Sequence, residues 1–257
     1  MPEILTPTFF AGLAIDKPQE RIPTINCLIY GESSVGKTTL VGGADAVPAM
    51  RKVLLVDIEK GDLSLRKTSY RPDVVRISTW AELGAIYHAL LAGGHGYKTV
   101  VIDSLTEVQD LNMKDIMLEE TEDESETPEW KHWNINQVRM LRLLRNFRDL
   151  PMNVIFTAHV KEDKDPRTGK LKKLPDLPGK LGRKVPVIFD NVLYYYMKEV
   201  VVEGNTVQKR LILTTKIEET VSKNRGSDQL PQIIEVGTTS ETATMELIYN
   251  GIIGGAK

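Results

Sequence analysis

The stretch Ile29-Tyr30-Gly31-Glu32-Ser33-Ser34-Val35-Gly36-Lys37-Thr38-Thr39-Leu40 contains the pattern G-x-x-x-x-G-K-[ST] without a departure. The two glycines allow the backbone to curl with its N–H groups pointing inward. A helix that begins near Lys37 would direct the positive end of its dipole at the same point. Residues 26–30 are largely apolar and enter the loop as a strand should, so a chance glycine turn is the weaker interpretation. The pattern predicts a loop that binds the phosphates of a nucleoside triphosphate.

Individual positions of this loop have separate predicted roles. Lys37 would reach the β and γ phosphates, and the Thr38 hydroxyl would ligate Mg²⁺. The sequence therefore predicts ATP and Mg²⁺ as the bound groups. The predicted nucleotide-binding residues are Gly31, Glu32, Ser33, Ser34, Val35, Gly36, Lys37, Thr38 and Thr39.

Composition limits the classes of protein that fit. The chain has 257 residues, enough for one sizeable α/β domain, and its formal net charge of -2 offers no general attraction for nucleic acid or membrane. Cys27 is its only cysteine, which excludes an internal disulfide and a zinc site built on several cysteines. No apolar stretch is long enough to span a membrane and no signal peptide is evident. We expect a cytoplasmic protein.

Strand and helix patterns alternate along the chain, which predicts a mostly parallel central sheet covered by helices on its faces. Residues 1–24 are expected to form an irregular N-terminal arm, and residues 25–257 one P-loop domain. Two β-rich runs flank Gly204-Asn205, which predicts a C-terminal β-hairpin. The expected strands are 26–30, 52–57, 74–77, 99–103, 152–159, 191–203 and 207–217, and the expected helices begin after the P-loop and at about 82, 104, 130 and 242.

Acidic residues follow two of these strands. Asp103 ends the run Val100-Val101-Ile102 and fits the Walker B acid that holds Mg²⁺ through water. The alternative is that it caps the helix beginning at Ser104, and the two roles can coexist. ATP hydrolysis needs a second carboxylate to orient the attacking water, yet no Glu follows Asp103 directly. Glu59, at the end of an earlier strand, is the candidate for this base, unless it is a surface carboxylate paired with Lys60.

A basic segment lies between residues 160 and 185. It contains nine basic residues against four acidic ones, shows no apolar period, and is expected to be a long loop. Such a loop binds polyanion phosphates or is a solvated lysine-rich lid, and because it lacks aromatic residues its contacts would depend only weakly on sequence. The candidate DNA-binding residues are Lys161, Lys164, Arg167, Lys170, Lys172, Lys173, Lys180, Arg183 and Lys184.

These motifs together resemble those of compact RecA-like ATPases of the kind that bacteriophages encode. The resemblance covers residues 25 to about 235 and includes the P-loop, Asp57-Ile58-Glu59, Val100-Val101-Ile102-Asp103-Ser104, Phe156-Thr157-Ala158-His159 and the basic segment. Such proteins are known as phage nucleotide-binding proteins of the AAA/RecA type, and some act in single-strand annealing or recombination.

The resemblance implies roles for further residues. It makes Glu59 the catalytic base, and it puts His159 where RecA-like proteins commonly carry a polar residue, often Gln, that senses the γ phosphate; a structural histidine is the alternative. Lys223-Asn224-Arg225 resembles a basic element that reaches the γ phosphate of a neighbouring subunit, which makes Lys223 and Arg225 catalytic candidates. The implied partners are single-stranded DNA, further copies of the chain in a ring or filament, and a single-strand DNA-binding protein.

Three hypotheses for function follow. The leading one is an ATP-dependent protein that binds single-stranded DNA in phage recombination, annealing or replication in the bacterial host cytoplasm, with slow hydrolysis that DNA or assembly stimulates. The second is a nucleotide-gated protein-interaction module, such as a loader or packaging accessory, without direct DNA binding. A small-molecule kinase is disfavoured because no acceptor-site motif or lid arginine cluster is evident.

Overall fold

The computed structural model of the chain describes residues 9–15, 23–164, 169–217, 219–225, 229–236 and 241–254. Most of the predicted N-terminal arm lies outside these residues, as does the predicted DNA-binding residue Arg167. The described part of the arm is a small antiparallel pair, β1 (Phe9–Phe10) and β2 (Leu13–Ala14). No helix in the described part of the chain is long and apolar enough to cross a membrane.

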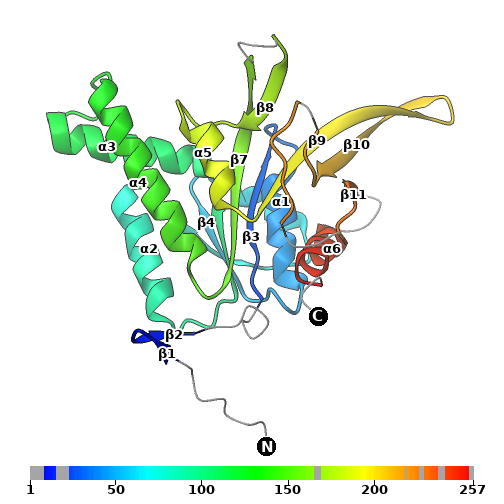
Figure 1. The fold of residues 1–257 in the computed structure, drawn as a ribbon. Coiled ribbons are helices and arrows are strands. Elements are labelled where there is room, and N and C mark those ends of the chain that lie inside the picture. Colours follow the sequence, from blue (N-terminus) through cyan, green and yellow to red (C-terminus); the bar gives the residue numbers. More distant parts are fainter. Residues whose placement is uncertain are drawn as a thin grey trace, which may run out of the picture.

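A nine-stranded sheet forms the centre of the molecule (Figure 1). Its order is β11-β10-β9-β3-β7-β6-β4-β5, with β8 paired to β7 outside this path. The strands from β9 to β5 are parallel, whereas β8, β10 and β11 run antiparallel to their neighbours. The strands are β3 (Asn26–Gly31), β4 (Val53–Asp57), β5 (Asp73–Arg76), β6 (Thr99–Asp103), β7 (Asn153–Lys164), β8 (Leu171–Pro175), β9 (Asn191–Val202), β10 (Asn205–Leu213) and β11 (Ile233–Val236).

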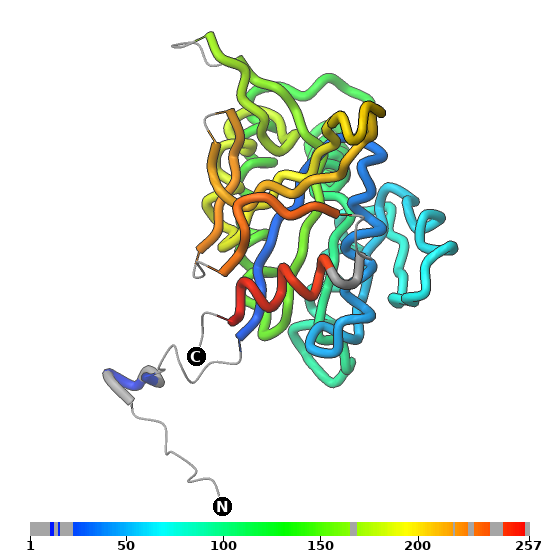
Figure 2. Tube along the Cα trace, turned by 90° about the vertical axis from the view of Figure 1, so that its right-hand side faces the viewer, coloured from blue at the N-terminus to red at the C-terminus, as the bar shows by residue number. Residues whose placement is uncertain are grey.

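Helices cover both faces of this sheet. Helices α2 to α5 lie on one face, and α1 and α6 lie on the other, where Figure 2 shows α6 in front of the strands. The helices are α1 (Lys37–Gly42), α2 (Trp80–Ala92), α3 (Leu105–Thr121), α4 (Trp130–Arg148), α5 (Leu181–Ile188) and α6 (Glu241–Ile253).

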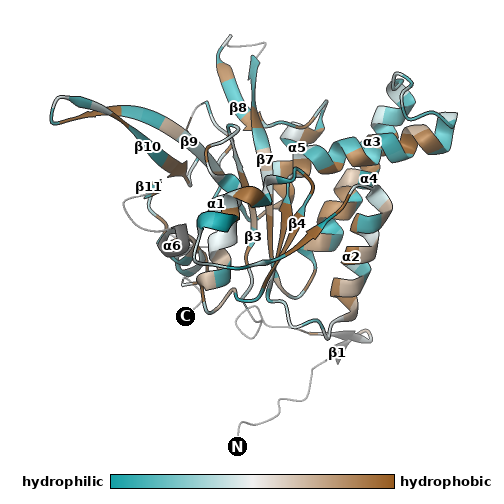
Figure 3. Cartoon of the chain, turned by 180° about the vertical axis from the view of Figure 1, so that it is seen from behind, coloured by the Kyte–Doolittle hydropathy of each residue, from teal (hydrophilic) through white to brown (hydrophobic). Residues whose placement is uncertain are grey.

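Alternation along each strand divides the core between the two faces. In β3, Leu28 and Tyr30 face the core beneath α2 to α5, whereas Cys27 and Ile29 face the core beneath α1 and α6. All six residues of β3 are buried, as a strand covered on both faces requires. Hydrophobic residues accordingly gather on the central strands in Figure 3. Burial also raises the pKa of the Cys27 thiol, as expected for a structural rather than a reactive cysteine.

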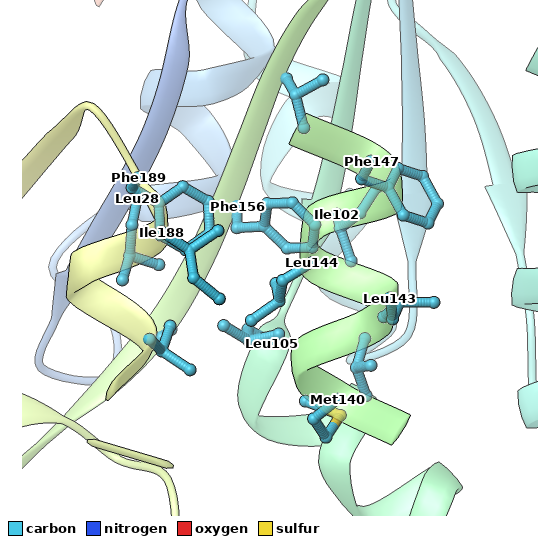
Figure 4. Close-up of a cluster of buried hydrophobic side chains, with 14 of the residues drawn as sticks. Leu28, Ile102, Leu105, Met140, Leu143, Leu144, Phe147, Phe156, Ile188 and Phe189 are labelled. Atoms are coloured by element: carbon cyan, nitrogen blue, oxygen red, sulfur yellow. The ribbon is translucent and has the colours of Figure 1, made fainter. Parts of the chain in front are cut away.

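Aromatic side chains join α4 to the sheet and to the residue after α5. Phe156 of β7 meets Phe147 of α4 at 5.9 Å between ring centroids and Phe189 at 5.4 Å, both edge to face (Figure 4). All three side chains are fully buried. Each such pair adds roughly 1 kcal/mol beyond the apolar area it buries. The cluster fixes α4 and α5 against β7, the strand that carries His159.

The predicted architecture, an α/β domain with a mostly parallel central sheet flanked by helices and a β-hairpin toward its C-terminal end, is confirmed. The hairpin is β9–β10, although its two-residue turn is Glu203-Gly204 rather than Gly204-Asn205. Both turn residues have positive φ, at 50° and 81°, as the twist of a tight hairpin favours.

The expectation that residues 160–185 form a long loop is wrong. Strand β7 continues to Lys164 and pairs with β8, and α5 begins at Leu181. Opposite charges face each other across this pair, since Glu162 lies opposite Lys173 and Asp163 opposite Lys172. Cross-strand charge pairs stabilise a hairpin that has no apolar alternation to reveal it in the sequence. We call this hairpin, residues 160–164 and 171–175, the charged arm.

Gly31 permits the close approach of β3 to β9, because a Cβ atom there would overlap the Tyr195 carbonyl. We predict that Gly31→Ala lowers the free energy of unfolding by about 3 kcal/mol or more. The matched control is Gly84→Ala in α2, where a Cβ would meet nothing within 4 Å. This change should raise the free energy by about 1 kcal/mol, because alanine favours helix. Urea unfolding measures both, and equal effects of the two changes would contradict the proposed strand packing.

Candidate active site

The P-loop has the geometry that its sequence predicts. Strand β3 ends at Gly31, the chain turns, and α1 begins at Lys37. Gly36 precedes the helix with φ 103°, a conformation that L side chains rarely adopt. The glycine is therefore required where the loop turns into the helix.

Lys37 is buried inside the loop. Its ammonium donates hydrogen bonds to the carbonyl oxygens of Gly31 at 3.1 Å and Glu32 at 2.9 Å. Burial lowers its pKa, while the nearby Glu59 and Asp103 carboxylates oppose that shift. A buried ammonium held by neutral carbonyls is electrostatically prepared for an incoming phosphate anion.

Asp103 and Thr38 form the predicted magnesium position. The Thr38 hydroxyl donates to Asp103 Oδ2 at 2.6 Å, and Thr157 of β7 donates to Asp103 Oδ1. Burial raises the pKa of Asp103, and the two hydroxyl hydrogen bonds act in the opposite direction. No group of three or more His, Cys, Asp or Glu suited to a metal occurs in the described chain. A hydroxyl beside one carboxylate instead fits Mg²⁺ whose remaining oxygen ligands would come from a nucleotide and water.

Parallel strands bring the two acidic motifs together. Asp57 of β4 lies in register with Asp103 of β6. The Asp57 carboxylate accepts hydrogen bonds from the backbone of Gly61 at 3.1 Å and of Asp62 at 3.3 Å, so it fixes the turn that follows the strand. Of the two acids in Asp57-Ile58-Glu59, Glu59 is thus left to face the site.

Glu59 pairs with His159, not with Lys60, the alternative partner considered from the sequence. Glu59 Oε1 lies 3.0 Å from His159 Nε2. Burial alone would raise the pKa of Glu59, but His159, Ser104 and Lys37 together lower it. The hydrogen bond to Glu59 raises the pKa of His159 above its usual value, against the opposing effects of burial and Lys37. Glu59 is therefore ionised, as a catalytic base must be.

Two side chains near the P-loop were not predicted. If Gly36 carried a Cβ, it would lie 3.5 Å from the guanidinium of Arg210 in β10 and 3.5 Å from the hydroxyl of Tyr195 in β9. No local pattern marks these residues, because the antiparallel pairing of β10 with β9 is what carries Arg210 over the loop. Gly61 was also missed, and a Cβ there would lie 3.2 Å from Thr38 Oγ1.

Lys223 and Arg225, the predicted contacts to a neighbouring subunit, are engaged within their own chain. Lys223 donates to the Phe189 carbonyl, and Arg225 pairs with Asp190 at 3.0 Å. The backbone of Lys223 bridges Val192, near the start of β9. A role on a neighbouring γ phosphate remains a prediction, and it requires these side chains to leave their present partners.

Several predicted DNA-binding residues are partnered by acids. Lys161 pairs with Asp176 at 3.7 Å, Lys173 with Glu162 at 3.8 Å, and Arg183 with Asp163 at 3.2 Å. The remaining described ones have exposed side chains: Lys164 and Lys172 lie on the charged arm, Lys170 just before β8, Lys180 just before α5, and Lys184 within α5.

The AAA domain family matches residues 24–226, and the chain belongs to this family. Together with the P-loop, Asp103 and Glu59, this membership makes the chain a P-loop ATPase. No protein of curated function matches the sequence.

Solved structures show limited similarity. The RadB recombinase is 17% identical with a TM-score of 0.47, and the match covers 86% of this chain and 90% of that one. A KaiC-like protein from Pyrococcus horikoshii OT3 is 16% identical with a TM-score of 0.41, covering 83% and 90%. An ATPase from a bacterial type III secretion system is 18% identical with a TM-score of 0.44, covering 66% and 51%. The family assignment rests on the AAA domain match alone.

The Glu59–His159 pair predicts a pH-dependent stability. A lowered Glu59 pKa contributes stability above its ordinary value of 4.5, and a raised His159 pKa contributes below its ordinary value of 6.5. The contribution is therefore full between these values and is lost as pH rises through the folded pKa of His159. His159→Gln should cost about 1 kcal/mol at about pH 6 and much less at about pH 9, as measured by urea unfolding. A cost independent of pH would contradict the ion pair.

Arg210 should strengthen nucleotide binding because it adds positive charge over the P-loop. We predict that Arg210→Ala weakens ATP binding about tenfold, as measured by calorimetry with Mg²⁺. Lys198→Ala is the control, since it removes the same charge from an exposed position on β9. An equal loss in both variants would indicate only a change in overall charge.

Proposed function

We propose that this ATPase binds single-stranded DNA and that the state of its nucleotide controls this binding. The observation that carries the proposal is a basic cavity of about 530 Å³. Four basic side chains line it, namely Lys172, Arg183, Lys216 and Lys223, and none of the acidic residues that the structure describes does. Such a cavity suits the phosphates of a polyanion.

A direct structural route from the γ phosphate supports the proposed control. We call the edge of the sheet that carries the P-loop, Glu59, Asp103 and His159 the catalytic edge. There His159 contacts Glu59, and β7 continues from His159 into the charged arm. The arm supplies Lys172 to the basic cavity. A nucleotide that changes the contacts of Glu59 would therefore act on the root of the arm.

In this mechanism Lys37 and the loop N–H groups hold the β and γ phosphates of ATP. Thr38 and Asp103 would hold Mg²⁺, which neutralises charge that develops on the phosphates. Glu59 orients a water molecule for attack on the γ phosphate and accepts its proton. Lys223 and Arg225 would complete the site of an adjacent subunit in a ring or filament, so that hydrolysis is slow until the protein assembles.

The biological setting that we propose is phage recombination, annealing or replication, and it rests on the resemblance of the motifs to phage-encoded RecA-like proteins. A nucleotide-gated protein-interaction module is the second candidate. Exposed valines near the tip of the β9–β10 hairpin favour it, because Val201 is 73% and Val202 is 44% exposed.

We predict that single-stranded DNA stimulates ATP hydrolysis and that Lys172→Ala/Lys216→Ala removes this stimulation. The double variant should weaken DNA binding and reduce its salt dependence, because two fewer phosphates are neutralised. Lys67→Ala/Lys198→Ala removes the same charge from exposed positions outside the cavity and should behave as the wild type. Steady-state ATPase assays and fluorescence anisotropy with a labelled oligonucleotide measure both effects.

Glu59→Gln separates catalysis from binding in the same assays. It should lower kcat by at least about 100-fold and leave ATP-dependent DNA binding in place. If DNA does not change the ATPase activity, and the affinity for DNA does not depend on salt concentration, the proposal is rejected in favour of a protein partner.

A further inference from the structure

A second cavity lies on the other side of α5 from the basic one. Its volume is about 460 Å³, within the range of small-molecule sites. Residues from the first half of α4 form one wall, and the turn before α5 with the start of that helix forms the other. The lining residues are Trp130, Trp133, Asn134, Asn136, Gln137, Pro178, Gly179, Lys180, Leu181 and Lys184. We call this cavity the tryptophan pocket.

Two tryptophans are unusually exposed at this pocket. Trp130 is 73% and Trp133 is 36% exposed. Their spacing of three residues puts them on the same side of α4. Large aromatic side chains gain from burial, and their flat faces suit stacking on another planar ring.

Amide groups add hydrogen-bonding capacity to the same pocket. Asn136 is only 1% exposed, and its Oδ1 accepts a hydrogen bond from Asn112 at 2.6 Å. Its Nδ2 has no hydrogen-bond partner among the described residues. Because it is buried against Asn112 of α3, the Asn136 side chain belongs to the packing of α4 on α3. Asn134 and Gln137 line the pocket beside it, and amides of this kind pair with the edges of nucleobases.

Basic residues at and near α5 line both the tryptophan pocket and the basic cavity. Lys180 and Lys184 line the pocket, while Arg183, the next residue on the helix, lines the basic cavity. Helix α5 therefore separates the two cavities and presents positive charge to both. Among the residues that the structure describes, no acidic side chain lines either cavity. A polymer with alternating phosphates and planar bases matches this arrangement of charge and aromatic surface.

We propose that the tryptophan pocket takes an unstacked base of single-stranded DNA whose backbone crosses α5 to the basic cavity. The inference rests on the proposed DNA binding and assigns a base-stacking site to it. Trp130 and Trp133 stack on the base, Asn134 and Gln137 pair with its edge, and Lys180 and Lys184 contact the flanking phosphates. The strand is thereby held by its bases as well as by its charge.

The test compares an ordinary oligonucleotide with an abasic one of equal length and charge, in the presence of ATP and Mg²⁺. The wild type should bind the ordinary strand about tenfold more tightly, because a stacked base contributes to affinity. Trp130→Ala should remove this preference without altering the salt dependence of binding. Trp130→Phe keeps an aromatic face and should restore most of the preference. Because Trp130 is exposed, both Trp130 variants should have the same basal ATPase activity as the wild type in the absence of DNA.

The outcomes separate this inference from the proposed function. If the wild type fails to retain either strand, DNA binding itself is rejected. If it binds both strands equally, and Lys172→Ala/Lys216→Ala weakens both, DNA binding stands and the stacking site is overturned. If a mononucleotide quenches tryptophan emission as strongly as the oligonucleotide does, the ligand of the pocket is a free nucleotide rather than a DNA strand. An acidic peptide that competes for the wild type but not for Trp130→Ala would replace it with a protein segment.

Discussion

Everything at the catalytic edge depends on the parallel register of four neighbouring strands. Gly31 of β3 lies beside His159 of β7, and Asp57 of β4 lies beside Asp103 of β6. Between these pairs, β6 and β7 are also parallel and in register. Parallel strands end at the same edge of a sheet, so residues scattered over more than half of the chain reach one place. A shift of one residue in any pairing would turn these side chains to the opposite face.

This edge gathers charges that would be costly if buried singly. Lys37 and Asp103 are almost fully buried, and the half-buried Glu59 and His159 complete an alternation of positive and negative groups. Burial lowers the pKa of Lys37 and raises that of Asp103, so desolvation alone acts to neutralise both groups. Nearby opposite charges and hydroxyl donors counter that tendency. The residues that would contact ATP are thus held in position by these interactions before it arrives, which is electrostatic preorganisation.

The residues of the catalytic edge could be predicted from the sequence because each of them belongs to a short, contiguous motif. The P-loop is contiguous, and Asp103 and Glu59 each follow a short apolar run that ends in the sheet. Arg210 was not predictable in this way, since its position over Gly36 depends on how the β9–β10 hairpin packs beside β3. The charged arm was missed for a related reason. Its pairing uses charges opposite one another, whereas strands are recognised in a sequence by apolar alternation.

The tryptophan pocket also could not be predicted from local sequence, because it is formed by segments that are far apart in the chain. In the sequence, the basic segment contains no aromatic residue, which argued for contacts to phosphates alone. The fold brings α4 against α5, and Trp130 and Trp133 then line a pocket with Lys180 and Lys184 of that segment. Residues that lie about fifty positions apart therefore form one surface. Strand β7 joins the catalytic edge to the charged arm, and the arm supplies Lys172 to the basic cavity, so in the proposed function ATP turnover and DNA binding would be coupled through β7.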